Sequence, residues 1–335
     1  MRIVGIGGGT GLPVLLKGLT EISNPQTPLD LTAIVTVSDS GGSTGILRRA
    51  FNMPAMGDIR NCLISLAAKD SVLTSVCQHR FDNPETFAGH SVGNLILSAL
   101  YQMSGNFAAA VRQASDLLEL KGRVFPATET PVTLCALYEN GTIAEGESDI
   151  PKPGLHISRV WLDPDDPAPA PGVLEALETA DAIVIGPGSL YTSIIPNLLV
   201  AGVADALKAS RAIKIYICNL MSQVGETDGY SAAEHVQHLL EYLEAPIDVC
   251  VLNSSTIGTA VAERYLKSGS EMVAASSEDQ DQIRRMGVVP VAAPLLSDGE
   301  VKARHDPRTL ARLVVSLARG FAGVHEIICS QGNGR

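Results

Sequence analysis

Short runs of β-branched and other apolar residues alternate with longer amphipathic stretches along most of the chain. The short runs predict β-strands, and the stretches between them carry apolar residues at helical spacing and predict helices. Strands and helices in alternation are typical of a mainly parallel sheet covered by helices. The expected strands are 2–7, 31–37, 181–186, 213–218 and 247–252, and the expected helices are 12–22, 203–209, 230–243, 257–267, 279–286 and 307–320.

Two segments depart from this alternation. Residues 57–120 predict a helical insertion that caps one end of the sheet, and residues 130–162 predict a small β-hairpin excursion. Asn140-Gly141 is a strong hairpin turn signal within the excursion. The helical spacing in the insertion covers 58–68, 93–103 and 107–120, and the β patterns of the excursion cover 132–138, 142–147 and 157–162.

The chain is expected to form one domain. A proline-rich loop over 163–171 could mark a boundary, but strands on both sides of it are needed to build one site. We therefore expect a single α/β domain over residues 1–325 and a flexible tail over 326–335.

Composition and charge restrict the class of ligand. The 335 residues are 45% hydrophobic and 18% charged, which is typical of a globular protein with a large core. A net charge of -11 argues against a broad nucleic-acid-binding surface, and 4% aromatic residues argue against base-stacking platforms. Six cysteines without C-x-x-C spacing predict buried free thiols in a reducing compartment. With no signal-peptide pattern and no membrane span, we expect a cytoplasmic protein.

Clusters of glycine, hydroxyl and amide residues follow the predicted strands. Carboxyl ends of parallel strands share one edge of the sheet, and bare backbone N–H groups together with helix N-termini bind anions there. The densest cluster follows the first strand and contains Gly8, Gly9, Thr10 and Gly11, with Thr10 the expected N-cap of the next helix. Thr10 breaks the dinucleotide-binding fingerprint, and no nucleoside-triphosphatase loop is present. The alternative interpretation is a turn that needs glycine only for packing.

A second cluster follows the strand at 31–37. Its carboxylate, Asp39, is placed to accept a ribose hydroxyl or to hold a divalent cation such as Mg²⁺, and it is the one candidate catalytic residue. A solvated turn with local hydrogen bonds is the alternative. The candidate ligand contacts in this cluster are Ser38, Asp39, Ser40, Gly41, Gly42, Ser43 and Thr44.

Further candidate contacts come from later segments. Arg60 suits phosphate geometry if the helix that opens at Gly57-Asp58 faces the site, although Asp58 could simply be an N-cap. Tyr265 could stack on a base or pack on its helix, and Arg304 could pair on the surface. The other candidates are Asn61, Asn94, Gly186, Gly188, Ser189, Tyr191 and Asn219.

Five motifs in this order resemble the bacterial gluconeogenesis factor family, which is related to the 2-phospho-L-lactate transferases. They are Gly7–Leu12, Ser38–Gly45, Gly57–Asn61, Gly93–Leu95 and Gly186–Ser193, and the resemblance extends to about residue 325. It implies a Rossmann-like three-layer α/β/α fold and a role in cell shape and envelope precursor supply during gluconeogenic growth. It also implies binding of a UDP-sugar such as UDP-N-acetylglucosamine, with Tyr265 and Arg304 as contacts.

Three functions follow from these features. The first is a regulatory protein that binds a nucleotide-sugar, or another phosphate-bearing small molecule, without turnover. The second is a Mg²⁺-dependent transferase of a phospho-acid group, which is weakened because the loop at Asp39 carries one carboxylate where the transferase pattern carries two. A dinucleotide-dependent oxidoreductase fits the first loop only. A homo-oligomer and regulatory protein partners remain open.

Overall fold

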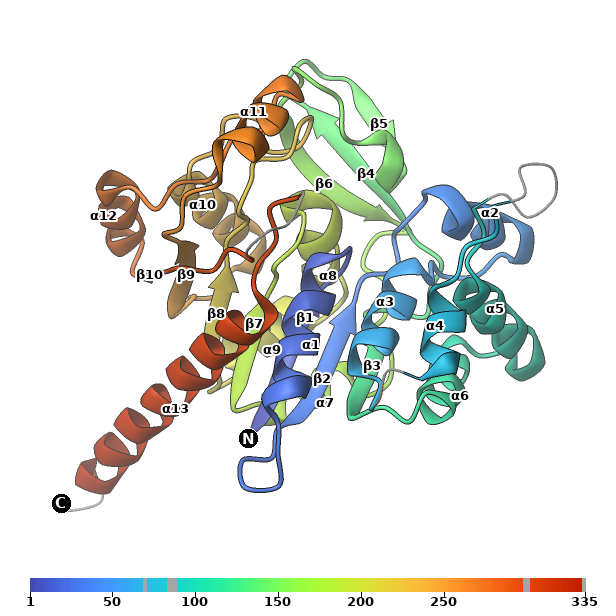
Figure 1. The fold of residues 1–335 in the computed structure, drawn as a ribbon, viewed down its shortest axis with the longest axis horizontal. Coiled ribbons are helices and arrows are strands. Elements are labelled where there is room, and N and C mark those ends of the chain that lie inside the picture. Colours follow the sequence, from blue (N-terminus) through green and yellow to red (C-terminus); the bar gives the residue numbers. More distant parts are fainter. Residues whose placement is uncertain (69–70, 83–88, 298–301, 333–335) are drawn as a thin grey trace.

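The computed structural model describes residues 1–68, 71–82, 89–297 and 302–332. Its centre is a seven-stranded sheet whose neighbouring strands are all parallel, in the order β10-β9-β8-β7-β1-β2-β3 (Figure 1). The strand order reverses beside β1, so β1 and β7 flank the crevice where α/β sheets bind ligands. The strands are β1 Arg2–Gly7, β2 Asp30–Val35, β3 Gly122–Pro126, β7 Ala182–Ile185, β8 Ile213–Ile217, β9 Val249–Asn253 and β10 Val289–Ala293.

Burial explains which strands the sequence revealed. Strands β7, β8 and β9 are buried along their whole length, and their sequences are mostly apolar, with Lys214 in β8 and Asn253 at the end of β9 as the polar exceptions. The edge strands β3 and β10 were missed because β3 mixes buried and exposed positions, β10 has no fully buried position, and each contains a proline, which an edge strand tolerates.

Helices cover both faces of the sheet, as expected for the three-layer fold. On one face α1 packs between α3 and α13, and on the other α7, α8, α9 and α10 pack together (Figure 1). The helices are α1 Gly11–Ile22, α2 Gly42–Phe51, α3 Gly57–Leu66, α4 Val72–Gln78, α5 Val92–Ser104, α6 Phe107–Leu117, α7 Val173–Thr179, α8 Ile195–Leu198, α9 Val203–Ala209, α10 Ala232–Leu243, α11 Thr259–Lys267, α12 Ser277–Arg285 and α13 Pro307–Gly332, and a π-helical turn, Leu190–Ile194, leads into α8.

Three local expectations need correction. Thr10 occupies the N-cap position of α1, but its side chain makes no capping hydrogen bond. The polar cluster after β2 is only partly a loop, since α2 begins at Gly42. Helix α13 continues to Gly332 rather than ending near residue 320. The division into one domain and a tail stays a prediction, and residues 333–335 of that tail lie outside the described residues.

The β excursion is present as a separate antiparallel sheet. It consists of β4 Thr133–Tyr138, β5 Ile143–Glu145 and β6 Ile157–Asp163, in the order β5-β4-β6. A one-turn 3₁₀ helix, Glu147–Asp149, follows β5. Figure 1 places this sheet and α11 over the end of the large sheet at which the glycine-rich loops lie. The excursion therefore stands beside the candidate site.

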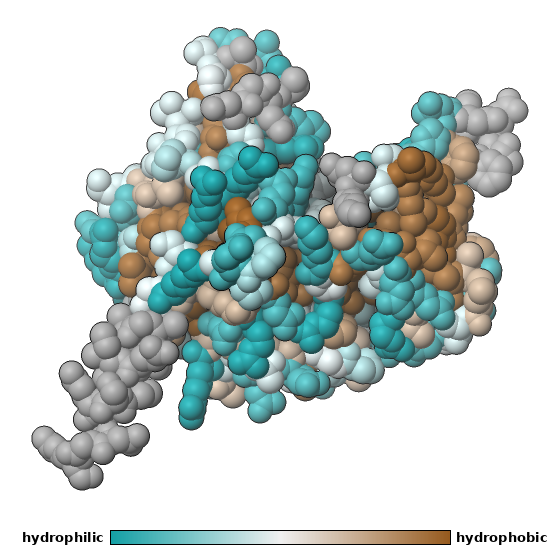
Figure 2. Space-filling view, turned by 60° about the horizontal axis from the view of Figure 1, so that its bottom comes forward, coloured by the Kyte–Doolittle hydropathy of each residue, from teal (hydrophilic) through white to brown (hydrophobic). Residues whose placement is uncertain are grey.

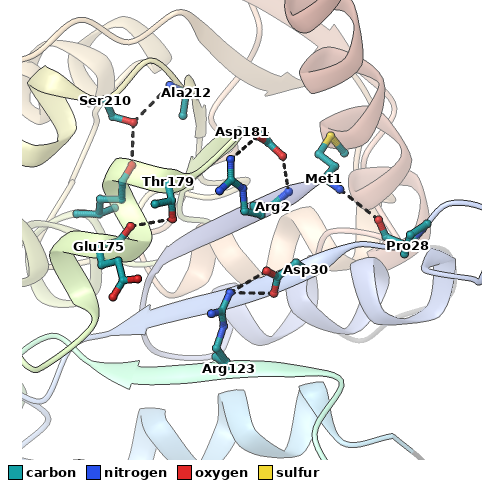
Figure 3. Close-up of polar contacts among 11 residues, drawn as sticks. Met1, Arg2, Pro28, Asp30, Arg123, Glu175, Thr179, Asp181, Ser210 and Ala212 are labelled. Atoms are coloured by element: carbon teal, nitrogen blue, oxygen red, sulfur yellow. Dashed lines mark hydrogen bonds and ion pairs between the residues drawn. The ribbon is translucent and has the colours of Figure 1, made fainter.

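Polar contacts join neighbouring strands at the opposite, amino-terminal edge of the sheet. Arg2 at the start of β1 pairs with Asp181 before β7 at 3.3 Å, and Asp30 of β2 pairs with Arg123 of β3 at 2.9 Å (Figure 3). All four side chains are exposed, so each pair contributes about 0–1 kcal/mol. These pairs align the strands at the edge remote from the site.

The surface is polar over most of the face in Figure 2, with a broad apolar area on the side where α4, α5 and α6 lie. Val72 on α4 is 83% exposed and Met103 on α5 is 80% exposed.

No single helix of the described chain is long and apolar enough to cross a bilayer, although Leu190–Leu198 and Val203–Ala209 reach that length and composition together across a 77° bend. The cysteines with described side chains are free and buried: Cys62, Cys77, Cys135, Cys218 and Cys250.

Candidate functional site

Two glycine-rich loops meet at the crevice between β1 and β7. A Cβ atom added to Gly11 would lie 2.3 Å from the carbonyl oxygen of Pro187, and one added to Gly188 would lie 3.6 Å from the carbonyl oxygen of Gly8. The Asn197 amide helps to hold this junction, because its Nδ2 donates to the carbonyl oxygen of Gly7 at 3.2 Å. The loops after the first strand and after β7 therefore form one continuous main-chain surface.

A cavity of about 280 Å³ opens onto this surface. Its far wall comes from α11 and from the segment before α13, where the Tyr265 hydroxyl accepts a hydrogen bond from the N–H of Ala303 at 3.1 Å. That bond fixes Tyr265 beside Arg304. The structure thus brings eight of the predicted residues around one cavity: Gly9, Thr10, Gly11, Gly188, Ser189, Asn219, Tyr265 and Arg304.

Sequence reasoning missed the residue that connects two of these. Gln223 donates from Nε2 to the Ser189 hydroxyl at 2.5 Å and accepts from Asn219 Nδ2 at 3.1 Å. This chain of amide and hydroxyl groups is uncharged and can offer both donors and acceptors to a ligand. No glycine-rich pattern surrounds Gln223, so only its spatial position identifies it. Met221 and Ser222 also line the cavity and were not predicted, and so do His305 and Ser193, the last residue of the predicted motif Gly186–Ser193.

A second carboxylate, Asp58, lies close to Asp39. A Cβ on Gly57 would come within 2.5 Å of Asp39 Oδ2, and a Cβ on Gly8 would come within 2.6 Å of Asp58 Oδ2. The N–H of Gly9 donates to the Asp58 carboxylate. Asp58 is not the N-cap of α3, because Met56 holds that position and Asp58 is the second helical residue. The Ser38–Gly45 loop does contain one carboxylate, but α3 supplies another.

Burial, with a smaller contribution from the neighbouring charge of Asp39, raises the pKa of Asp58 to about 7, while the Gly9 N–H and Arg60 oppose the shift. No three His, Cys, Asp or Glu side chains in the described part of the chain converge to hold a metal ion. Mg²⁺ commonly uses one or two carboxylates together with phosphate oxygens. Asp39 and Asp58 fit that donor set, provided that a phosphate-bearing ligand completes it.

Two further carboxylates lie beyond this pair. Burial raises the pKa of Glu147 to about 7, with Asp39 and Asp58 adding to the shift. Burial likewise raises the pKa of Glu226 to about 7, and the Thr192 hydroxyl lies 3.2 Å from each of its carboxylate oxygens. The β excursion contributes Glu147 and is attached to the loop after β2 through a 2.7 Å hydrogen bond between the hydroxyls of Ser40 and Ser148.

Arg60 is held in one orientation by three side chains. It donates to Ser91 Oγ, to Asn94 Oδ1 at 3.0 Å and to Asn61 Oδ1 at 2.7 Å, and Asn61 Nδ2 donates to the carbonyl oxygen of Gly9 at 3.3 Å. Asn94 is buried, so it supports Arg60 rather than lining the cavity. Arg60 and Asn61 instead line an adjoining cavity.

The remaining candidates lie away from the first cavity. Tyr191 is buried and its hydroxyl lies 3.0 Å from that of Tyr230, so it does not point into the cavity. Ser38 bonds to Thr36 at 2.9 Å, and Ser43 bonds to His90 at 2.9 Å. These contacts order the loop and α2. The other candidates outside the cavity lining are Gly8, Asp39, Ser40, Gly41, Gly42, Thr44 and Gly186.

Comparison with known proteins assigns the family. The family model described as 2-phospho-L-lactate transferase CofD matches residues 3–296, and the chain belongs to the CofD family. Similar proteins include gluconeogenesis factors from Halalkalibacterium halodurans, 41% identical over 94% of this chain and 95% of that protein, and from Bacillus subtilis, 41% identical over 95% and 98%. A crystal structure of a protein from Bacillus halodurans, described as a member of the UPF0052 family, superposes with a TM-score of 0.88 at 40% identity, covering 94% of this chain and 98% of that one.

Proposed function

We propose that this chain is a regulatory protein that binds a nucleotide-sugar of the UDP-N-acetylglucosamine type and acts in growth on gluconeogenic carbon. The observation that carries the proposal is the junction of the loops at Gly11 and Gly188, facing Tyr265 and Arg304 across one cavity. Bare main-chain N–H groups suit a diphosphate, a guanidinium adds charge, and an aromatic ring suits uracil.

The names of its relatives support the physiological part of this proposal, since several are gluconeogenesis factors. We place the action in the cytoplasm, in control of cell shape and envelope precursor supply. Deleting the gene and comparing growth and cell width on gluconeogenic and glycolytic carbon tests this part. Equal growth and equal shape on both carbon sources would count against it.

Calorimetry tests the ligand. Titration of UDP-N-acetylglucosamine into the wild-type chain should show binding, and Arg304→Ala and Tyr265→Ala should each weaken it by at least about tenfold, as expected for a lost charge-assisted or stacking contact. Arg211→Ala, an exposed change outside both cavities, is the control. Absence of binding to the wild-type chain rejects the ligand, and unchanged binding to Arg304→Ala removes Arg304 from the site.

A second candidate function is a Mg²⁺-dependent transfer of a phospho-acid group from a nucleotide diphosphate donor. The position of Asp58 next to Asp39 favours it, because together they supply the carboxylates that Mg²⁺ needs. The test is Mg²⁺-dependent release of the nucleotide from a phospholactate-type donor, with Asp58→Asn as the inactive control. No release with a range of acceptors would leave the binding function as the explanation.

A further inference from the structure

A second cavity of about 480 Å³ adjoins the first and is lined by positive charge. Lys17 of α1, Arg60 of α3, Arg80 and Arg304 all line it, and none of the described residues that line it is Asp or Glu. The two cavities share Thr10, Val14, Arg304 and His305 as their common wall. Four cationic side chains around one cavity stand out in a chain whose net charge is -11.

Two of the cationic groups, Arg60 and Arg80, repel each other. Burial lowers the pKa of Arg60, and the nearby Arg80 lowers it further, whereas Asp58, Asp39 and Cys77 raise it. Among the described residues, Arg60 has no carboxylate within ion-pair distance. Like charges held close together cost free energy, and an anion placed between them would remove that cost.

Several of these side chains are already oriented. Arg60 is fixed by Ser91, Asn94 and Asn61, and Arg80 donates from Nη1 to the carbonyl oxygen of Gly89 at 2.8 Å. Lys17 lies one turn beyond Pro13 and Val14 on α1, and both of those residues also line the cavity. The two arginines are therefore held in place before a ligand binds, which reduces the entropic cost of binding.

We propose that the second cavity binds the phosphate group of a small phosphorylated metabolite, a phosphate monoester, separately from the nucleotide in the first cavity. A phosphate monoester carries close to two negative charges at neutral pH. Guanidinium groups match its oxygens in a bidentate geometry, and lysine adds a point charge. The volume lies within the range of small-molecule sites. The shared wall brings this phosphate next to the nucleotide site.

Calorimetry with glycerol 3-phosphate in phosphate-free buffer tests the site without added nucleotide. The variant Lys17→Gln/Arg80→Gln removes two charges that line only the second cavity, and both side chains are exposed. The control Lys208→Gln/Arg211→Gln removes two exposed charges outside both cavities, so it changes the net charge equally. Thermal unfolding of each variant confirms that it is folded.

We expect the wild-type chain and the control to bind equally and the Lys17→Gln/Arg80→Gln variant to bind at least about tenfold more weakly. A repeat with saturating UDP-N-acetylglucosamine should still show one phosphate monoester bound. The proposal is overturned if the wild-type chain shows no binding up to about 10 mM, if the variant binds like the control, or if the nucleotide-sugar displaces the monoester. If the nucleotide-sugar itself does not bind, the variant comparison still decides this proposal independently.

Discussion

The backbone of Gly11 lies directly against the carbonyl group of Pro187, where a Cβ atom would come within 2.3 Å of the oxygen and 2.6 Å of the carbon. The position therefore needs glycine for close approach of two main-chain segments rather than for an unusual backbone angle. This contact joins the first glycine-rich loop to the loop after β7. The proposed anion site depends on that junction.

Gly11→Ala should separate the two loops. Backbone atoms cannot move aside as a side chain can, so we expect a destabilisation of about 1–3 kcal/mol and a loss of nucleotide-sugar binding. Urea unfolding and calorimetry measure the two effects. Gly258→Ala is the matched control, since nothing lies within 4 Å of its added Cβ and its φ is -61°. Equal stability and binding in the two variants would contradict the importance of the junction.

Gly18 of α1 permits a similarly close approach to the start of α13. A Cβ there would lie 1.9 Å from the carbonyl oxygen of Pro307. Gly18→Ala should force α1 and α13 apart and cost about 3 kcal/mol in urea unfolding. Gly320→Ala, on an exposed stretch of α13 with open space around it, should instead stabilise the chain by up to about 1 kcal/mol through helix propensity. Equal destabilisation of the Gly18→Ala and Gly320→Ala variants would contradict the importance of the close approach between α1 and α13.

Asp58→Asn should change the pH dependence of stability. The folded-state pKa of Asp58 is raised to about 7, above the unfolded value near 4. Its contribution is therefore fully present below about pH 4 and is lost as the pH rises through 7. We expect Asp58→Asn to match the wild-type chain near pH 4 and to become more stable than it near pH 8, as measured by urea unfolding.

The same variant tests cation binding. At pH 8 Mg²⁺ with a nucleotide should raise the unfolding temperature of the wild-type chain and not that of Asp58→Asn, because a cation that binds only the folded state stabilises it. The exposed Asp116→Asn should behave like the wild-type chain in both experiments. A Mg²⁺ response retained by Asp58→Asn would place the cation elsewhere.

The titration of His305 should lower the stability of the fold as the pH falls. This is opposite to the effect of Asp58, over nearly the same pH range. Burial lowers the pKa of His305 to about 4, and its Nε2 has no hydrogen-bond partner among the residues that the structure describes. A base whose folded-state pKa is depressed contributes stability that is present above pH 6.5 and is lost as the pH falls towards 4. His305→Gln should therefore flatten the decline in stability between pH 6.5 and 4. An unchanged slope in urea unfolding would show that folding does not lower the pKa of His305.

Several parts of the site could be predicted because they follow local rules. The loops at Gly9 and Gly188 were identified from glycine after an apolar run, and the topology of a parallel sheet then requires them to share one edge. Asp58 and Gln223 were not assigned to the site, since an aspartate in the first turn of a helix and a glutamine in a loop have common structural roles. Tyr191 belongs to a predicted motif but is turned away, because rotamer and burial are set by tertiary packing.

The sequence alone determined the alternation of strands and helices and the position of the main loops, since these depend on local periodicity. Tertiary structure alone decided which strands are neighbours, that Asp58 joins Asp39, and that Lys17, Arg60, Arg80 and Arg304 surround one cavity. These relationships join residues far apart along the chain. They arise when the hydrophobic core packs the helices onto the sheet, and no local pattern encodes that arrangement.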